Sequence, residues 1–279
     1  MIKYNPKDWF GLIFQFHRSD TFRILLPTIL LLGVLTAGLV YAHQEGYIHW
    51  KSTTAFHQIL GFVLSMLLVF RINSAYDRWW EGRKLWGSLV NSSRSLGAKV
   101  HAYLASSHPQ ECSELLKRLG NFPTLLKDHL RSQSPSVHQP LASYHRLVQD
   151  LTRLNQSKAL STEQFLALNP EVTALMDITG ACERIKNTPI PFSYGLFLKK
   201  VIFIYVVTTP FTFAIEYGYW GVVVVMAVFY AFASLELISE EVEDPFGLDA
   251  NDLPLDELAD KIRKNIESLS VPRGPQDPA

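Results

Sequence analysis

Four long stretches of the chain carry no charged residue. Three of these runs have 19 residues, and they extend from Ile24 to Ala42, from Ser52 to Phe70 and from Tyr217 to Leu235. A fourth run of 15 residues extends from Val201 to Ile215. A helix of about 20 apolar residues crosses the hydrocarbon core of a bilayer, which is about 30 Å thick. A soluble protein with buried helices would explain one such run but hardly four, so the pattern predicts four transmembrane helices.

The last two runs are separated by a single charged residue, Glu216. The residues that follow it are aromatic or turn-forming: Tyr217, Gly218, Tyr219 and Trp220. Aromatic side chains gather at the surfaces of a bilayer. The pattern therefore predicts a helical hairpin whose turn lies at a membrane interface.

Basic residues near the ends of the spans predict the orientation. The segment before the first span and the segment after the second are rich in them: Lys3, Lys7, Arg18 and Arg23, then Arg71, Arg78, Arg83 and Lys84. The loop between these spans carries only Lys51. Since cytoplasmic loops carry the excess of Lys and Arg, we expect a multi-pass protein of the cell inner (plasma) membrane with both termini in the cytoplasm. The first apolar run begins too late and is too long for a cleavable signal peptide.

The segment between the second and third spans has helical patterning. Apolar residues recur at the spacing of a packed helix directly after the second span, which predicts that this span continues into the cytoplasm: Trp79, Trp80, Leu85, Trp86, Leu89 and Val90. Loops are expected at Ser106–Pro109 and Ser132–Pro140, and further helices at Leu141–Leu154 and Pro170–Ile185. The prolines of Thr188–Pro191 end this segment.

The remainder after the fourth span is predicted to hold an amphipathic helix. Apolar residues share one face over Leu255–Leu269, and a proline-rich tail that we expect to be disordered begins at Val271. The chain thus divides into 1–71 with the first two spans, a helical cytoplasmic domain at 72–198, the last two spans at 199–238 and a cytoplasmic end at 239–279. The predicted fold class is all-α, with four transmembrane helices and a helical cytoplasmic domain.

Charge and motifs give no positive reason to propose several classes of function. The 26 basic and 26 acidic residues balance, which gives no reason to expect a nucleic-acid partner. Metalloprotease, nucleophile-elbow, phosphate-loop and CxxC motifs are missing from the sequence. The nine histidines are scattered, and none stands three or four residues from another on a helix. The two cysteines, Cys112 and Cys182, form no metal-type spacing. No enzymatic activity is predicted.

The second span carries a stripe of bulky apolar residues. Phe62, Met66 and Phe70 are spaced by four, so they lie along one side of the helix, and Gly61 and Ser65 form an adjacent stripe of small residues. Helices arranged around an axis could form stacked apolar collars from such a stripe. The same stripe could simply face lipid or a partner helix, and periodicity alone favours that interpretation.

Two polar regions flank the spans. Residues 71–94 are rich in tryptophan and arginine. The arginine guanidinium groups could stack on indole rings or pair with Asp77 and Glu81. A structural girdle at the membrane surface is favoured over a ligand site. A run of carboxylates follows the fourth span and could ligate Ca²⁺. It could equally cap the next helix, whose first turn contains Asp256 and Glu257, and capping is favoured.

At these residues the chain resembles the bacterial branch of the bestrophin family. The specific blocks are FRINSAYDRWWEGRKLWG at 70–87, CERIKNTPIPFSYGL at 182–196 and EEVEDPFGLDANDLPLD at 240–256. The resemblance covers nearly the whole chain. It implies a homopentamer with one central pore that passively conducts small monovalent ions, chloride-type anions first, without a required cofactor. A monovalent cation channel of the same architecture, or a membrane scaffold that does not conduct, is the alternative.

The resemblance also implies positions for functional residues. The family's narrow apolar neck falls on Phe62, Met66 and Phe70, where Met66 departs from the isoleucine or phenylalanine that the family commonly uses. A second constriction falls near Ser161–Gln164, with Glu163 and Gln164 as its candidates; a ring of five Glu163 carboxylates would favour cations. Animal members carry a calcium clasp after the fourth span, matched here by Asp249 and Asp252, although the unbroken acidic run of that clasp is missing.

Overall fold

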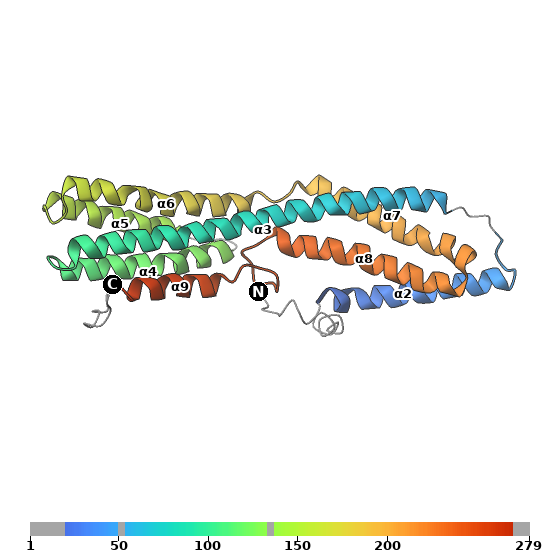
Figure 1. The fold of residues 1–279 in the computed structure, drawn as a ribbon. Coiled ribbons are helices and arrows are strands. Elements are labelled where there is room, and N and C mark those ends of the chain that lie inside the picture. Colours follow the sequence, from blue (N-terminus) through green and yellow to red (C-terminus); the bar gives the residue numbers. More distant parts are fainter. Residues whose placement is uncertain (1–19, 50–53, 133–136, 270–279) are drawn as a thin grey trace, which may run out of the picture. The chain divides into compact units, whose positions relative to one another are not determined.

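The computed structural model describes residues 20–49, 54–132 and 137–269, and all regular structure within these ranges is helical (Figure 1). This confirms the all-α class. The described chain forms two compact units, one from the residues up to Arg78 together with Pro189–Glu243, the other from Trp79–Thr188 together with the residues from Asp244 onward. The units divide at 78/79, 188/189 and 243/244, some residues away from the boundaries expected after residues 71, 198 and 238, and the first division lies within α3.

The first unit, here called the membrane unit, contains the predicted spans. It comprises α2 (Asp20–Gln44), the first part of α3 (Ala55–Leu104), α7 (Phe192–Tyr217) and α8 (Tyr219–Glu243). All four helices are long and apolar enough to cross a bilayer, which confirms the four expected spans. Leucine, isoleucine, valine and aromatic side chains form the interior of this unit. Its outer surface exposes further large apolar side chains such as Leu31, Phe203 and Val223, as is typical of helices in contact with lipid.

The α7–α8 hairpin confirms the predicted turn between the last two spans, and the place of this turn at a membrane interface stays a prediction. Gly218 has a φ of +54°, a left-handed conformation that favours glycine, and its carbonyl accepts a hydrogen bond from the Gly221 amide at 2.9 Å. The two helices pass so closely that a Cβ on Gly221 would lie 2.4 Å from the carbonyl oxygen of Phe213. Both spans extend beyond their uncharged runs, because α7 already begins after Pro191 and α8 continues to Glu243.

The second unit, here called the helical unit, packs around the last part of α3. Its other helices are α4 (Pro109–Arg131), α5 (Gln139–Gln156), α6 (Thr162–Asn187) and α9 (Leu255–Glu267). Trp86, Leu89 and Leu96 of α3 are fully buried in its core. The second span therefore does continue as one helix of 50 residues, as the sequence predicted. Cys112 and Cys182 are both free and buried, and burial raises the pKa of the Cys182 thiol to about 12.

Two helices of this unit differ from the sequence prediction: α6 begins earlier than expected, and no helix was predicted at α4. We expected a helix from Pro170, but α6 begins at Thr162 and carries Pro170 in its interior. The start is fixed by a capping box: the Ser161 hydroxyl accepts from the Gln164 amide at 3.2 Å, and the Gln164 side chain accepts from the Ser161 amide at 2.9 Å. The letters S-x-x-Q at 161–164 are the signal that could have revealed this start.

Substitution Gly221→Ala should destabilise the hairpin, because the added methyl group meets backbone that cannot rotate away. We expect a loss of about 1–3 kcal/mol, as for other overpacked sites. Gly38→Ala is the matched control, since an added Cβ at this exposed position of α2 meets no atom within 4 Å. It should be neutral or stabilising by up to about 1 kcal/mol. Thermal unfolding of both variants in the same detergent measures the difference, and equal midpoints would contradict the close approach.

Candidate pore-lining face and the charge cluster beside it

The predicted neck residues lie on an uncovered face of α3. Phe62 is 72% exposed in the single chain, Met66 is 52% exposed and Phe70 is 53% exposed. Ile59 and Val69 extend the same face and are also exposed. The structure thus places the three residues on one apolar side of a membrane-crossing helix, where they are free to face a pore, lipid or another subunit.

The opposite face of α3 is packed against the rest of the membrane unit. Leu64 and Leu68 are 0% and 1% exposed. At 100° per residue, they lie on the far side of the helix from the Phe62–Phe70 stripe. The buried imidazole of His57 lies on this packed side too, 3.0 Å from the Thr208 hydroxyl and 3.2 Å from that of Thr212. The orientation of α3 in the membrane unit is therefore well defined.

The stripe of small residues allows a close contact within the chain. A Cβ on Gly61 would lie 2.9 Å from the hydroxyl oxygen of Tyr205 on α7. Ser65, one turn further along α3, is exposed, and its hydroxyl donates to the Gly61 carbonyl at 2.7 Å. The predicted close approach of a neighbouring helix is thus found at Gly61, and the helix that approaches is α7.

A buried ion-pair cluster adjoins the stripe at Arg71. The Arg71 Nη1 lies 2.7 Å from Glu243 Oε2, and its Nε lies 3.8 Å from Glu236 Oε2. The second oxygen of Glu243 accepts from the Ile190 amide at 2.7 Å, and the Glu243 carbonyl accepts from Arg78 Nε at 3.1 Å. The cluster joins α3, the end of α8 and the proline-containing segment before α7.

These pairings differ from those that the sequence suggested for residues 71–94. We considered contacts of the arginines with Asp77, Glu81 or indole rings, but Arg71 pairs with carboxylates of α8. Glu81 instead pairs with Arg184, at 2.7 Å, on the surface of the helical unit. Glu240, another of the acidic residues after the fourth span, pairs with Lys199 of α7. The acidic run is therefore largely occupied by ion pairs within the chain.

The proposed calcium residues belong to a compact turn. Asp252 is buried, and one of its carboxylate oxygens accepts from the Asp249 amide at 2.6 Å, whereas the Asp249 side chain is exposed. Phe246 of the same turn lies over Gly82 of α3, where a Cβ would be 3.2 Å from the phenyl ring. The indole of Trp79 donates to the Asn251 carbonyl at 3.0 Å. At least one carboxylate oxygen thus holds the turn together, and calcium binding by Asp249 and Asp252 stays a prediction.

The acidic residues in the first turn of α9 have the expected position. Asp256 and Glu257 lie in that turn, where the helix dipole favours negative charge, but the N-cap residue is Pro254 and no described side chain makes a capping hydrogen bond. Asp256 accepts hydrogen bonds from Lys127 and Arg131 of α4, each at 2.8 Å. These hydrogen bonds, the one from Lys127 first, hold the pKa of the Asp256 carboxyl below its usual range.

The candidates for the second constriction lie at the start of α6. The Gln164 side chain is used in the capping box with Ser161. Glu163 is exposed, and a hydrogen bond with Ser161 holds its pKa below the usual range, so the carboxylate is ionised at neutral pH. Whether these residues line a pore stays a prediction.

Removal of the Arg71 guanidinium should be strongly destabilising. Arg71→Ala leaves the buried carboxylates of Glu236 and Glu243 without their countercharge, and loss of one partner of a buried ion pair costs about 3–5 kcal/mol. The matched control is Arg184→Ala, which breaks an exposed pair and should cost at most about 1 kcal/mol. Thermal unfolding in detergent compares the two, and a smaller loss for Arg71→Ala than for Arg184→Ala would contradict a stabilising role of the buried ion pairs.

Comparison with known proteins agrees with this architecture. The family model described as bacterial/fungal bestrophin protein matches residues 1–268. A voltage-dependent anion channel-forming protein of Nostoc sp. (strain PCC 7120) is 33% identical over 287 residues, which cover 95% of this chain and 92% of the relative. The voltage-dependent anion channel-forming protein YneE of Escherichia coli O157:H7 is 33% identical, with 97% and 94% of the two chains covered. The crystal structure of a bacterial bestrophin homologue from Klebsiella pneumoniae matches with a TM-score of 0.81 and 25% identity, over 88% of this chain and 98% of that chain. The chain belongs to the bacterial and fungal bestrophin family.

Proposed function

We propose that five copies of this chain form an anion channel in which α3 of each subunit lines a central pore. The observation that carries the proposal is the uncovered apolar face of α3, with Phe62, Met66 and Phe70 exposed while the opposite face is buried. The relatives from Nostoc and Escherichia coli, which bear the name of anion channel-forming proteins, support anions as the conducted ions. A pentamer accounts for the uncovered face, because each copy would turn it toward a shared axis.

The stripe suits the neck of such a pore. Five copies of three bulky apolar residues would form three stacked collars, which block ions by steric closure or by exclusion of water. The middle collar, made by Met66, would be the most adaptable, since an unbranched thioether side chain has three rotatable bonds. The collars carry no charge, so they would gate the flow of ions and leave selectivity to other parts of the pore.

The rest of the chain fits passive conduction in a bilayer. Ion flow down a gradient needs no covalent step, which agrees with the missing enzyme motifs and requires no cofactor. The excess of basic residues beside the first two spans supports an inner (plasma) membrane location with both termini and the helical unit in the cytoplasm. The partners implied are further copies of the chain, lipid and small monovalent ions.

Selectivity for cations is the second candidate, and it rests on Glu163. This carboxylate is ionised and exposed at the start of α6. If five copies surrounded the pore axis, their negative charge would attract cations and repel anions. A membrane scaffold without conductance is the remaining alternative, and electrical recordings distinguish all three.

Widening the neck should increase the current. We expect the triple variant Phe62→Ala, Met66→Ala, Phe70→Ala to conduct severalfold more than the wild type in planar bilayers, because the collars lose most of their apolar bulk. Phe203→Ala is the matched control: it removes an exposed phenyl ring from α7 of the same unit and should leave the conductance unchanged. Absence of current from both the wild type and the triple variant would argue for the scaffold.

The reversal potential under a salt gradient tests the ion that is conducted. An anion channel should reverse close to the chloride equilibrium potential, and Glu163→Gln should leave that value unchanged. If Glu163 selects cations, the reversal potential of the wild type should instead lie close to the cation equilibrium potential. Glu163→Gln should then shift the reversal potential toward the chloride equilibrium potential. Glu114→Gln, which neutralises another exposed carboxylate of the helical unit, is the control. A wild-type reversal potential close to the cation equilibrium potential would contradict the proposal of an anion channel.

A further inference from the structure

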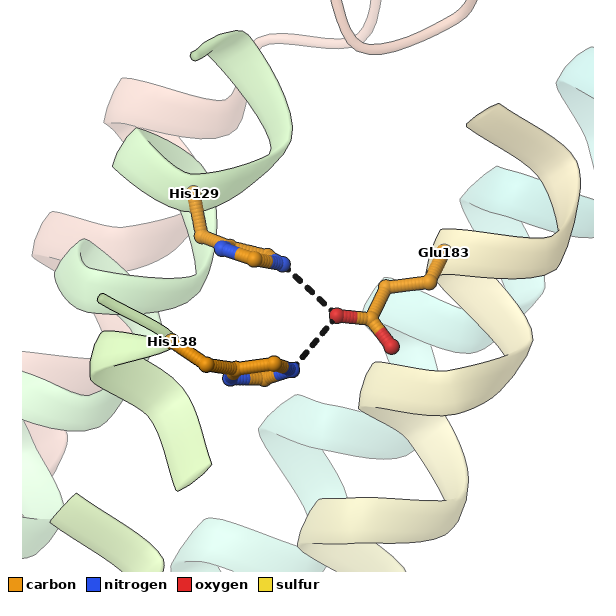
Figure 2. Close-up of side chains that lie close together, drawn as sticks. All are labelled: His129, His138 and Glu183. Atoms are coloured by element: carbon orange, nitrogen blue, oxygen red, sulfur yellow. Dashed lines mark hydrogen bonds and ion pairs between the residues drawn. The ribbon is translucent and has the colours of Figure 1, made fainter. Parts of the chain in front are cut away.

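Two histidines and a glutamate from three segments of the chain meet in the helical unit. His129 lies in the last turn of α4, His138 directly precedes α5, and Glu183 lies near the end of α6 (Figure 2). Nε2 of His129 is 2.6 Å from Glu183 Oε1, and Nε2 of His138 is 2.7 Å from the same oxygen. The two imidazole rings are stacked, with centroids 4.4 Å apart and planes inclined by 28°. Both rings thus direct their Nε2 atoms at one carboxylate.

We propose that this cluster binds a divalent transition-metal ion, Zn²⁺ above all. Its three potential ligand atoms all lie within 4.8 Å of one another. Two imidazole nitrogens and one carboxylate oxygen form a common ligand set for Zn²⁺ with a fourth position left to water. In a tetrahedral site with bonds of 2.0–2.1 Å, ligand atoms are about 3.3 Å apart, so the hydrogen-bonded atoms need to separate by less than about 1 Å.

The ligand set also excludes the commonest hard cations. Mg²⁺ and Ca²⁺ prefer six or more oxygen ligands, whereas this cluster supplies two nitrogens and a single carboxylate. Imidazole ligands suit Zn²⁺, Cu²⁺ and Ni²⁺. The cluster is accessible to an ion from solvent, because the side chains of His138 and Glu183 are 34% and 26% exposed, while that of His129 is 12% exposed.

The protons on the two rings define how a metal would enter. Nδ1 of His138 accepts the capping hydrogen bond from the Leu141 amide at 3.1 Å, so in the neutral ring the proton is on Nε2 and points to Glu183. A metal at Nε2 requires this proton to move to Nδ1, which breaks the capping hydrogen bond. The cost is the capping bond and the hydrogen bonds from the two rings to Glu183, against three metal–ligand bonds gained. Zinc–ligand bonds outweigh hydrogen bonds of this kind, so the exchange favours the metal.

The same shift of the ring proton from Nε2 to Nδ1 breaks fewer hydrogen bonds at His129. Its Nδ1 is buried and has no hydrogen-bond partner among the described residues, so only the hydrogen bond to Glu183 is lost when the proton moves from Nε2 to Nδ1. The peptide around His129 is already held in place, because Lys186, one turn after Glu183 on α6, donates to the carbonyls of His129 and Ser132 at 3.4 Å and 2.5 Å. A bound metal would therefore fasten the end of α4 and the start of α5 to α6.

Zinc binding by the full-length protein in detergent tests the proposal. After removal of metals with a chelator, isothermal titration should show a Zn²⁺ site in each chain, and Zn²⁺ should raise the thermal midpoint of unfolding. His129→Ala and Glu183→Gln should each weaken binding by roughly tenfold or more, since each removes a ligand. Co²⁺ serves as a spectroscopic probe, because its visible absorption intensifies on tetrahedral coordination.

His145→Ala is the matched control, since it removes an exposed histidine from α5 that lies outside the cluster. It should leave the Zn²⁺ affinity unchanged. Glu183→Gln keeps the shape and one hydrogen-bond acceptor of the side chain, so it decides the matter if His129→Ala fails to fold. Wild-type protein that binds no Zn²⁺, or a loss of affinity that is the same in His145→Ala and Glu183→Gln, would overturn the proposal. Neither result depends on ion conduction.

Discussion

The ion pair between Arg71 and the carboxylates of α8 determines which face of α3 points into the membrane unit. Arg71 lies on the packed side of the helix, together with Leu64 and Leu68. A rotation of α3 that buried Phe62 and Met66 would turn the guanidinium outward and separate it from Glu236 and Glu243. Because charged groups near hydrocarbon are costly unless they are paired, the cluster holds the apolar stripe on the uncovered side. The exposure of the candidate neck residues therefore depends on the ion pairs that Arg71 forms on the opposite, packed side of α3.

The three sequence blocks that carried the family resemblance contact one another in the structure. Within the membrane unit, Arg71 of the first block pairs with Glu243 of the third, which also accepts from Ile190 of the second. Within the helical unit, Glu81 of the first block pairs with Arg184 of the second. The blocks are thus distinctive in sequence because they supply the specific polar contacts, whereas the spans around them require only apolar side chains.

The sequence predicted the features that depend on local patterns. Hydropathy located the four spans, because each helix that crosses a bilayer must itself be apolar over about 20 residues. Helical periodicity likewise predicted the continuation of α3 beyond Phe70. The start of α6 is not predicted, because Pro170 resembles the first residue of a helix, whereas the structure carries this proline in the helix interior, well after the Ser161 cap. Partners of Arg71 and the cluster of His129, His138 and Glu183 could not be predicted, since they join helices distant in sequence and leave no periodic signal.

The regularity of α3 between Phe62 and Phe70 restricts how the aperture of a pore could change. Sharp bends in helices arise at proline, at glycine–serine pairs or where the hydrogen-bond ladder is interrupted. The segment from Phe62 to Phe70 contains no proline, and its glycine–serine pair lies at its start, where the Ser65 hydroxyl donates to the Gly61 carbonyl. Beyond Ser65 the segment contains no further hinge of these kinds. Opening would then proceed by displacement of α3 as a rigid rod or by a change of side-chain rotamers. Of the three residues, Met66 has the most rotamers available, so a switch in its torsion angles could alter the aperture while the helix stays still.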